Sequence, residues 1–112
     1  MSICDVYVGD LGKDGKLDWG GDYQRSNVPP RIGPVLTHFP SRRNPFFELL
    51  GWVRNGRLVG EQVDWGATAA MATPAQIRAF ADTCFEPVPE AITALIDSLM
   101  PDKVYALVAV EL

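Results

Sequence analysis

The chain has 112 residues, of which 47 % are hydrophobic and 21 % charged, with a net charge of −4, which suits one folded domain and excludes a disordered chain. It contains neither an apolar run of the roughly 20 residues that span a bilayer nor the basic head and apolar stretch of a signal peptide. The sequence therefore predicts a single cytoplasmic domain over residues 1–112 that does not enter a membrane.

The N-terminal part of the chain predicts two strands joined by a tight turn. Residues 3–10 alternate between apolar and polar side chains, as a half-buried strand does. Asp14-Gly15 is typical of a type I′ hairpin turn, in which both central residues adopt a positive φ. A second strand is expected through Leu17 and Trp19, which would complete a first hairpin.

The middle of the sequence is the least regular part. Residues 20–45 contain three glycines and five prolines, which favours a long irregular connection with a short extended piece from Ile32 to Phe39. Long connections in compact domains are often functional. Asn55-Gly56 then predicts a second hairpin from Leu50 to Val63 with at most one turn of helix before it, although Asn44-Pro45 also suits the start of a helix through Leu49 and Leu50.

Two helices and a buried strand are predicted for the C-terminal third. Thr73-Pro74-Ala75-Gln76 is a capping box with proline at the first helical position, and it begins a helix over 74–85. A second helix with one apolar face follows and ends at Met100-Pro101. Residues 104–110 are apolar at nearly every position, which is typical of a strand covered on both faces, here expected beside strand 3–10.

These elements predict an α+β fold. We expect an antiparallel sheet of about five strands, made of two hairpins plus the C-terminal strand, with two consecutive helices packed on one face. Cys4 and Cys84 lie in apolar surroundings far apart in the sequence, without the spacing of a metal or redox motif, so both are expected to be free buried thiols.

Charge is distributed unevenly along the chain. Both ends are acidic, whereas residues 24–57 hold six arginines and a single acid, Glu48. Arginines interleaved with aromatic residues bind phosphate, carboxylate or nucleic acid through bidentate contacts and stacking. The net negative charge is opposite to that of a dedicated nucleic-acid binder, so the sequence argues against nucleic acid as a partner.

The only histidine, His38, lies in the irregular connection and precedes Arg42-Arg43 by four residues. Histidine titrates near neutral pH and therefore suits a general base, while arginines hold anionic groups. No serine-nucleophile, metalloprotease or phosphate-loop motif accompanies these residues. An enzyme or anion-binding domain that uses His38, Arg42 and Arg43 is therefore an alternative hypothesis, and the sequence favours a protein that is not an enzyme.

The motif Asp-Trp-Gly occurs twice, at residues 18–20 and 64–66, each time where a strand is expected to end. A tryptophan at a strand end commonly covers the core. If the two copies lie side by side, they form an acidic and aromatic surface suited to a basic partner. The predicted partner-binding residues are Asp14, Asp18, Trp19, Asp22, Asp64 and Trp65.

A calcium loop is a weaker alternative for the same acidic stretch. Asp10, Asp14 and Gly15 fall at positions 1, 5 and 6 of an EF-hand loop, but position 12, which supplies the bidentate carboxylate, is Gly21. The sequence therefore predicts no resident metal and no cofactor. The residues of this weaker alternative are Asp10, Asp14, Asp18 and Asp22.

Small size, acidity, aromatic content and the lack of a catalytic motif favour a protein-interaction module. We expect a cytoplasmic inhibitor of bacterial or phage type, such as a toxin-neutralising immunity protein or a host-defence antagonist, that binds another protein through that protein's basic surface. A third alternative is a subunit that self-associates by burying apolar surface.

Overall fold

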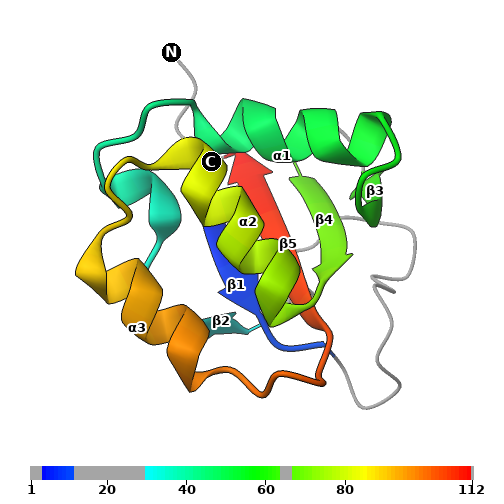
Figure 1. Ribbon diagram of the computed structural model, residues 1–112. Helices are drawn as coiled ribbons and strands as arrows, with labels where there is room; N and C mark the ends of the chain where they lie inside the picture. Colours follow the sequence, from blue (N-terminus) through cyan, green and yellow to red (C-terminus); the bar gives the residue numbers. More distant parts are fainter. Residues whose placement is uncertain (1–3, 12–29, 64–66, 112) are drawn as a thin grey trace.

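The computed structural model describes residues 4–11, 30–63 and 67–111 (Figure 1). The elements in chain order are β1 (Cys4–Gly9), β2 (Arg31–Ile32), the 3-10 helix η2 (Leu36–His38), α1 (Pro45–Arg54), β3 (Val59–Val63), β4 (Ala67–Ala72), α2 (Pro74–Cys84), α3 (Glu90–Ser98) and β5 (Tyr105–Glu111). The strands form one antiparallel sheet in the order β2-β1-β5-β4-β3. The predicted α+β fold with a five-stranded antiparallel sheet is confirmed.

The C-terminal strand β5 lies at the centre of the sheet, between β1 and β4. Val8 of β1 pairs with Leu107, and both side chains belong to the main hydrophobic core. Val108, the next residue of β5, belongs to a second buried cluster on the opposite face of the sheet. β5 is apolar on both faces because both are covered, which confirms the prediction that this strand is buried beside the first strand.

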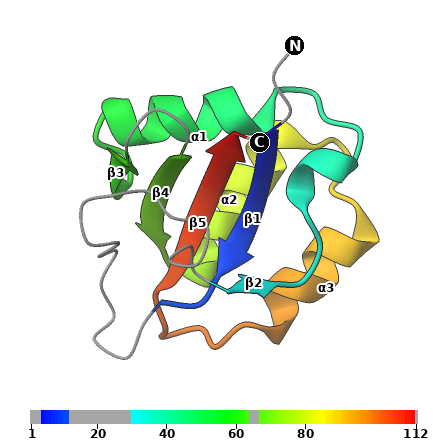
Figure 2. The same cartoon turned by 180° about the vertical axis from the view of Figure 1, so that it is seen from behind.

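The helices build the main core against one face of the sheet. Figure 1 shows α2 and α3 over this face and α1 across one end of it, and Figure 2 shows the opposite face from behind. Trp52 of α1 meets Phe80 of α2 in a T-shaped contact with ring centroids 5.4 Å apart. The guanidinium carbon of Arg57 lies 3.6 Å from the centroid of the Trp52 ring. Trp52 thereby links α1 to α2 and the segment after α1.

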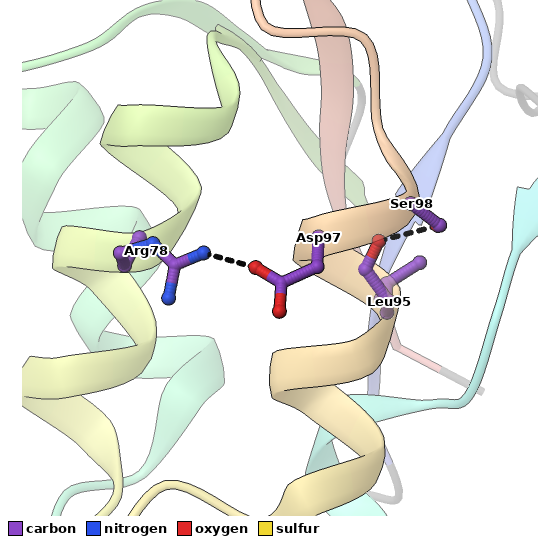
Figure 3. Close-up of polar contacts among 4 residues, drawn as sticks. All are labelled: Arg78, Leu95, Asp97 and Ser98. Carbon is purple, nitrogen blue, oxygen red and sulfur yellow. Dashed lines mark hydrogen bonds and ion pairs between the residues drawn. The ribbon is translucent and has the colours of Figure 1, made fainter.

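Helices α2 and α3 begin and pack as the sequence indicates. The Thr73 hydroxyl accepts a hydrogen bond from the Gln76 backbone N–H, and the Gln76 side chain accepts one from the Thr73 N–H, which completes the predicted capping box. Figure 3 shows Arg78 of α2 donating to the Asp97 carboxylate of α3 at 2.6 Å. In the same view the Ser98 hydroxyl donates to the backbone carbonyl of Leu95. Both predicted helices are confirmed.

The predicted hairpin from Leu50 to Val63 is wrong, because residues 45–54 form the helix α1. The Asn44 side chain accepts a hydrogen bond from the Phe46 N–H and Pro45 occupies the first turn, so the helix begins with a side-chain cap. Gly56 has a φ of +81° and follows the last turn of α1. Asn55-Gly56 thus ends a helix, where the left-handed conformation is also favoured, rather than turning a hairpin.

The strand content predicted around this helix is only partly correct. β3 pairs with β4, so the second hairpin lies later in the chain than expected. The first hairpin, with Asp14-Gly15 and the strand through Leu17 and Trp19, lies outside the described residues. The extended piece expected from Ile32 to Phe39 is replaced by the short strand β2 and the 3-10 helix η2. None of the helices in the described ranges has the length and apolar character of a membrane span.

Candidate functional site

The residues predicted to bind a partner are not among those that the structure describes. Asp14, Asp18, Trp19, Asp22, Asp64 and Trp65 all lie in residues 12–29 or 64–66. The acidic and aromatic surface therefore stays a prediction. Its second half follows β3 directly in the sequence, since this strand ends at Val63.

Asp10 is the one predicted calcium ligand that the structure describes; Asp14, Asp18 and Asp22 lie outside the described residues. Its carboxylate accepts a hydrogen bond from the Lys103 ammonium group at 2.8 Å. This hydrogen bond is the main cause that raises the pKa of Lys103 above its ordinary value. Within residues 4–11, 30–63 and 67–111 no three histidine, cysteine or acidic side chains gather as metal ligands.

The three candidate catalytic side chains, His38, Arg42 and Arg43, each approach a different carboxylate. The His38 imidazole is 72 % exposed, and its Nε2 lies 3.9 Å from the Asp5 carboxylate of β1. Arg42 forms an ion pair with Glu86, in the connection between α2 and α3. The Arg43 guanidinium lies 3.9 Å from the Glu48 carboxylate of α1. Each of the two arginines thus has a carboxylate of the protein beside it.

The loop that carries Arg42 and Arg43 is anchored to the end of α2. The backbone N–H groups of both arginines donate to the carbonyl oxygen of Cys84, at 2.6 and 3.3 Å. Carbonyls at a helix C-terminus lack helical partners, so this contact satisfies one of them and fixes the loop. The backbone of residues 42–43 thus joins the loop to the helix, and this contact does not involve the two guanidinium groups.

The Cys84 thiol below this loop is protected from reaction. Its side chain is fully buried, and both cysteines are free, as predicted. Burial is the main cause that raises the pKa of Cys84 to about 12, and the negative charge of Glu48 also raises it. The positive charge of Arg43 lowers this pKa but does not outweigh the other two effects. Since the thiolate is the nucleophilic form of cysteine, Cys84 does not suit a catalytic role. Cys4 is only half-buried, so the prediction of a buried thiol is wrong for this residue.

A pocket of about 360 Å³ lies at the start of α1. It joins parts of the chain that are far apart in sequence, namely β1, η2, the loop before α1 and the first turn of α1 itself. One part of the lining is apolar and another is polar, so the pocket offers both contact surface and hydrogen-bonding groups. Its lining residues are Cys4, Thr37, Ser41, Asn44, Pro45, Phe46 and Phe47.

Some of the polar groups of the pocket already have partners, and others are available. The Thr37 hydroxyl donates to the Cys4 carbonyl at 3.2 Å, and the Asn44 side-chain oxygen caps α1. The Ser41 hydroxyl and the Asn44 amide nitrogen have no hydrogen-bond partner in the described part of the chain. These two groups can therefore bind a ligand without breaking a contact of the fold.

Two consecutive phenylalanines form the apolar part of this site. Their rings meet in a T-shaped contact with centroids 5.4 Å apart. Phe46 is half-buried against the main core, whereas Phe47 is 66 % exposed. In the sequence these rings belong to the aromatic residues interleaved with the arginines of residues 24–57, a pattern that does not indicate the pocket. The pattern that indicates an exposed ring is the pair of adjacent phenylalanines after a helix start, because neighbouring residues of a helix point in different directions.

Two other large apolar side chains are exposed in the described part of the chain. Val59 in β3 is 75 % exposed and Met100 after α3 is 65 % exposed. Single exposed apolar residues are normal on protein surfaces and indicate no function. Phe47 differs from them because it lies at the rim of a pocket.

Comparison of the chain with protein families, with curated proteins and with solved structures finds no match. The functional assignment therefore rests on the geometry of the described residues and on the sequence.

Proposed function

We propose that this chain is a protein-interaction module that binds a segment of another protein at the start of α1. The observation that supports the proposal is the exposed Phe47 ring beside a pocket of about 360 Å³. Aromatic residues dominate the binding energy of many interfaces, and effective interfaces surround such an apolar centre with polar groups. Phe47 would supply the centre, and Ser41 and Asn44 would supply the polar groups.

The size of the pocket favours a short segment with one inserted side chain. Small-molecule sites have volumes of about 300–1,000 Å³, so this pocket lies at the small end of that range and suits a single bulky apolar group. The free Ser41 hydroxyl and Asn44 amide would then bond to the backbone of the inserted segment. We also propose the finer assignment, an inhibitor of the immunity-protein or defence-antagonist type, in which the acidic residues around Asp18 and Asp64 attract a basic partner.

The alternative function, an anion-binding or catalytic site built on His38, is supported less well. A carboxylate lies beside each of Arg42 and Arg43, and these carboxylates would compete with an anionic ligand. One observation favours this alternative. Ser41 and Asn44, which supply polar groups of the pocket, are the residues directly before and after these two arginines. Titration with inorganic phosphate, followed by the NMR shifts of the His38 ring, tests it. A saturable shift supports an anion site, and unchanged signals exclude phosphate at this position.

The test of the proposed function is quantitative affinity capture from lysate of the native host. We expect the tagged chain to capture one stoichiometric partner and Phe47→Ala to lose it, because the anchor ring is removed. Met100→Ala is the matched control, since it removes a similarly exposed apolar side chain far from the pocket, and it should capture the partner normally. Equal capture by Phe47→Ala would refute the site, and the absence of any stoichiometric partner would refute the function.

The acidic half of the proposal has its own variant. Asp18→Lys combined with Asp64→Lys reverses two charges that are predicted to face the partner. Loss of capture with an unchanged circular dichroism spectrum would support the charge-complementary surface. Unchanged capture would refute that surface while leaving the pocket at α1 in place.

A further inference from the structure

The loop between η2 and α1 is anchored by burial at its two ends. Phe39 is half-buried against the main core and Pro45 is buried, whereas residues 40–44 are all exposed. A segment with few buried apolar contacts opens at a low cost in free energy. The position of residues 40–44 therefore depends on the polar contacts that they make.

These polar contacts attach the loop to the C-terminal end of α2. The backbone N–H groups of Arg42 and Arg43 both donate to the carbonyl oxygen of Cys84, the last residue of α2. The guanidinium group of Arg42 also donates to the carboxylate of Glu86, two residues after the end of this helix. Two backbone contacts and one ion pair therefore hold the exposed part of the loop.

The same loop supplies polar groups to the pocket at the start of α1. Ser41 directly precedes Arg42, and Asn44 directly follows Arg43. Ser41 and Asn44 both line the pocket, together with Phe47 from the first turn of α1. The position of these two polar groups relative to the Phe47 ring therefore depends on how the loop is attached to α2.

We propose that Glu86 is a positioning residue of this pocket and acts through Arg42. Glu86 does not line the pocket, so its carboxylate holds the loop from outside through the Arg42 side chain. A loop fixed in this way keeps the Ser41 hydroxyl and the Asn44 amide in place for an inserted segment, and binding then costs less ordering. This inference rests on the proposed function, because it names a residue that tunes the affinity of the proposed binding site.

The expected effect is small, because the ion pair is exposed. An exposed ion pair changes an equilibrium constant by up to about fivefold. Without the pair, the equilibrium between the attached and the detached loop shifts by this factor, and the apparent affinity of the pocket falls with the attached fraction. We therefore expect Glu86→Gln to weaken binding at the pocket by about two- to fivefold.

A second ion pair at α2 provides a matched control. Arg78 of α2 donates to the carboxylate of Asp97 in α3 (Figure 3). The side chains of this pair are 48 % and 62 % exposed, close to the 54 % and 70 % of Arg42 and Glu86. Asp97→Asn and Glu86→Gln each remove one negative charge and one exposed ion pair. The difference between them is that Arg78 and Asp97 lie outside the loop that carries the polar groups of the pocket.

NMR titration of the ¹⁵N-labelled full chain with N-acetyl-leucine-N-methylamide tests the inference. This uncharged probe carries one bulky apolar side chain between two backbone amides, as the proposed partner segment does. We expect saturable shifts of the Ser41, Asn44 and Phe47 signals in the wild type. The dissociation constant should rise about two- to fivefold in Glu86→Gln and stay unchanged in Asp97→Asn. High salt should raise the wild-type value toward that of Glu86→Gln, because it screens the ion pair.

A charge exchange distinguishes positioning by this ion pair from a general loss of structure. Arg42→Glu alone should weaken binding more than Glu86→Gln, because it places two carboxylates together. The double variant Arg42→Glu/Glu86→Arg restores the pair in the opposite direction and should return the dissociation constant to the wild-type value. Wild-type affinity in Glu86→Gln, or no recovery in a double variant with a native circular dichroism spectrum, would overturn the inference and leave the proposed pocket in place. A wild type without saturable shifts would overturn both the inference and the pocket.

Discussion

Replacing Gly60 with alanine tests how closely the edge strand β3 approaches β4. A Cβ atom at Gly60 would lie 2.3 Å from the Ala69 carbonyl oxygen and 2.8 Å from the Ala70 Cα. Both are backbone atoms, so no side-chain rotation can relieve the overlap. Close carbon–oxygen contacts between strands are about 3.3–3.6 Å, so β3 would have to move by roughly 1 Å and weaken its hydrogen bonds to β4. We expect the free energy of unfolding to fall by about 2–3 kcal/mol.

Urea unfolding followed by circular dichroism at low micromolar protein concentration measures this change, and the melting temperature should fall by about 8–12 °C. The matched control is Gly51→Ala, whose Cβ meets no atom within 4 Å in the described residues. Because alanine has the higher helix propensity, this control should raise the free energy of unfolding by about 0.5–1 kcal/mol. The reasoning fails if Gly60→Ala unfolds at the same urea concentration as the wild type, or if both glycine variants change stability in the same direction.

Further predictions concern the core and the surface. Burial and the Glu48 charge raise the pKa of Cys84 to about 12, so at pH 8 iodoacetamide should modify it on the order of a thousand times more slowly in folded than in urea-unfolded protein, by mass spectrometry. Between pH 9 and 12 the folded protein keeps the Cys84 thiol protonated, whereas the unfolded chain, with the ordinary pKa of 9.0, loses the proton. The free energy of unfolding should therefore fall by up to about 1.4 kcal/mol per pH unit in this range. Unfolding curves of Cys84→Ala, measured in parallel, should lack this decrease. Phe80→Ala should lower the free energy of unfolding by about 3–5 kcal/mol in urea titrations, because this ring is fully buried. The exposed Arg78–Asp97 pair should show a coupling of only about 0.2–1 kcal/mol in a double-mutant cycle, decreasing with salt.

The elements that were predicted correctly are those whose sequence pattern has one structural explanation. Thr73 begins α2 through hydrogen bonds within one turn, so neighbouring residues suffice to predict it. The apolar run of β5 is also unambiguous, because a strand that is apolar on both faces must lie inside the sheet. Asn55-Gly56 was ambiguous, since hairpin turns and helix C-termini both favour residues that tolerate a positive φ. Whether the preceding residues are helical depends on Leu49 and Trp52 packing into the core, which the local sequence does not show.

The pocket depends on a helix that the sequence did not settle. The predicted hairpin began at Leu50 with at most one turn of helix before it, so the directions of the Phe46 and Phe47 rings stayed open. In a helix they diverge by about 100°, so one ring packs against the core and its neighbour faces outward. Once Asn44 is recognised as the first cap of the helix, the exposure of Phe47 can be predicted from its position in the first turn. Its position one turn before Gly51 can be predicted in the same way. The contribution of Cys4 does not follow in this way, because only the packing of β1 near the start of α1 brings this residue to the pocket.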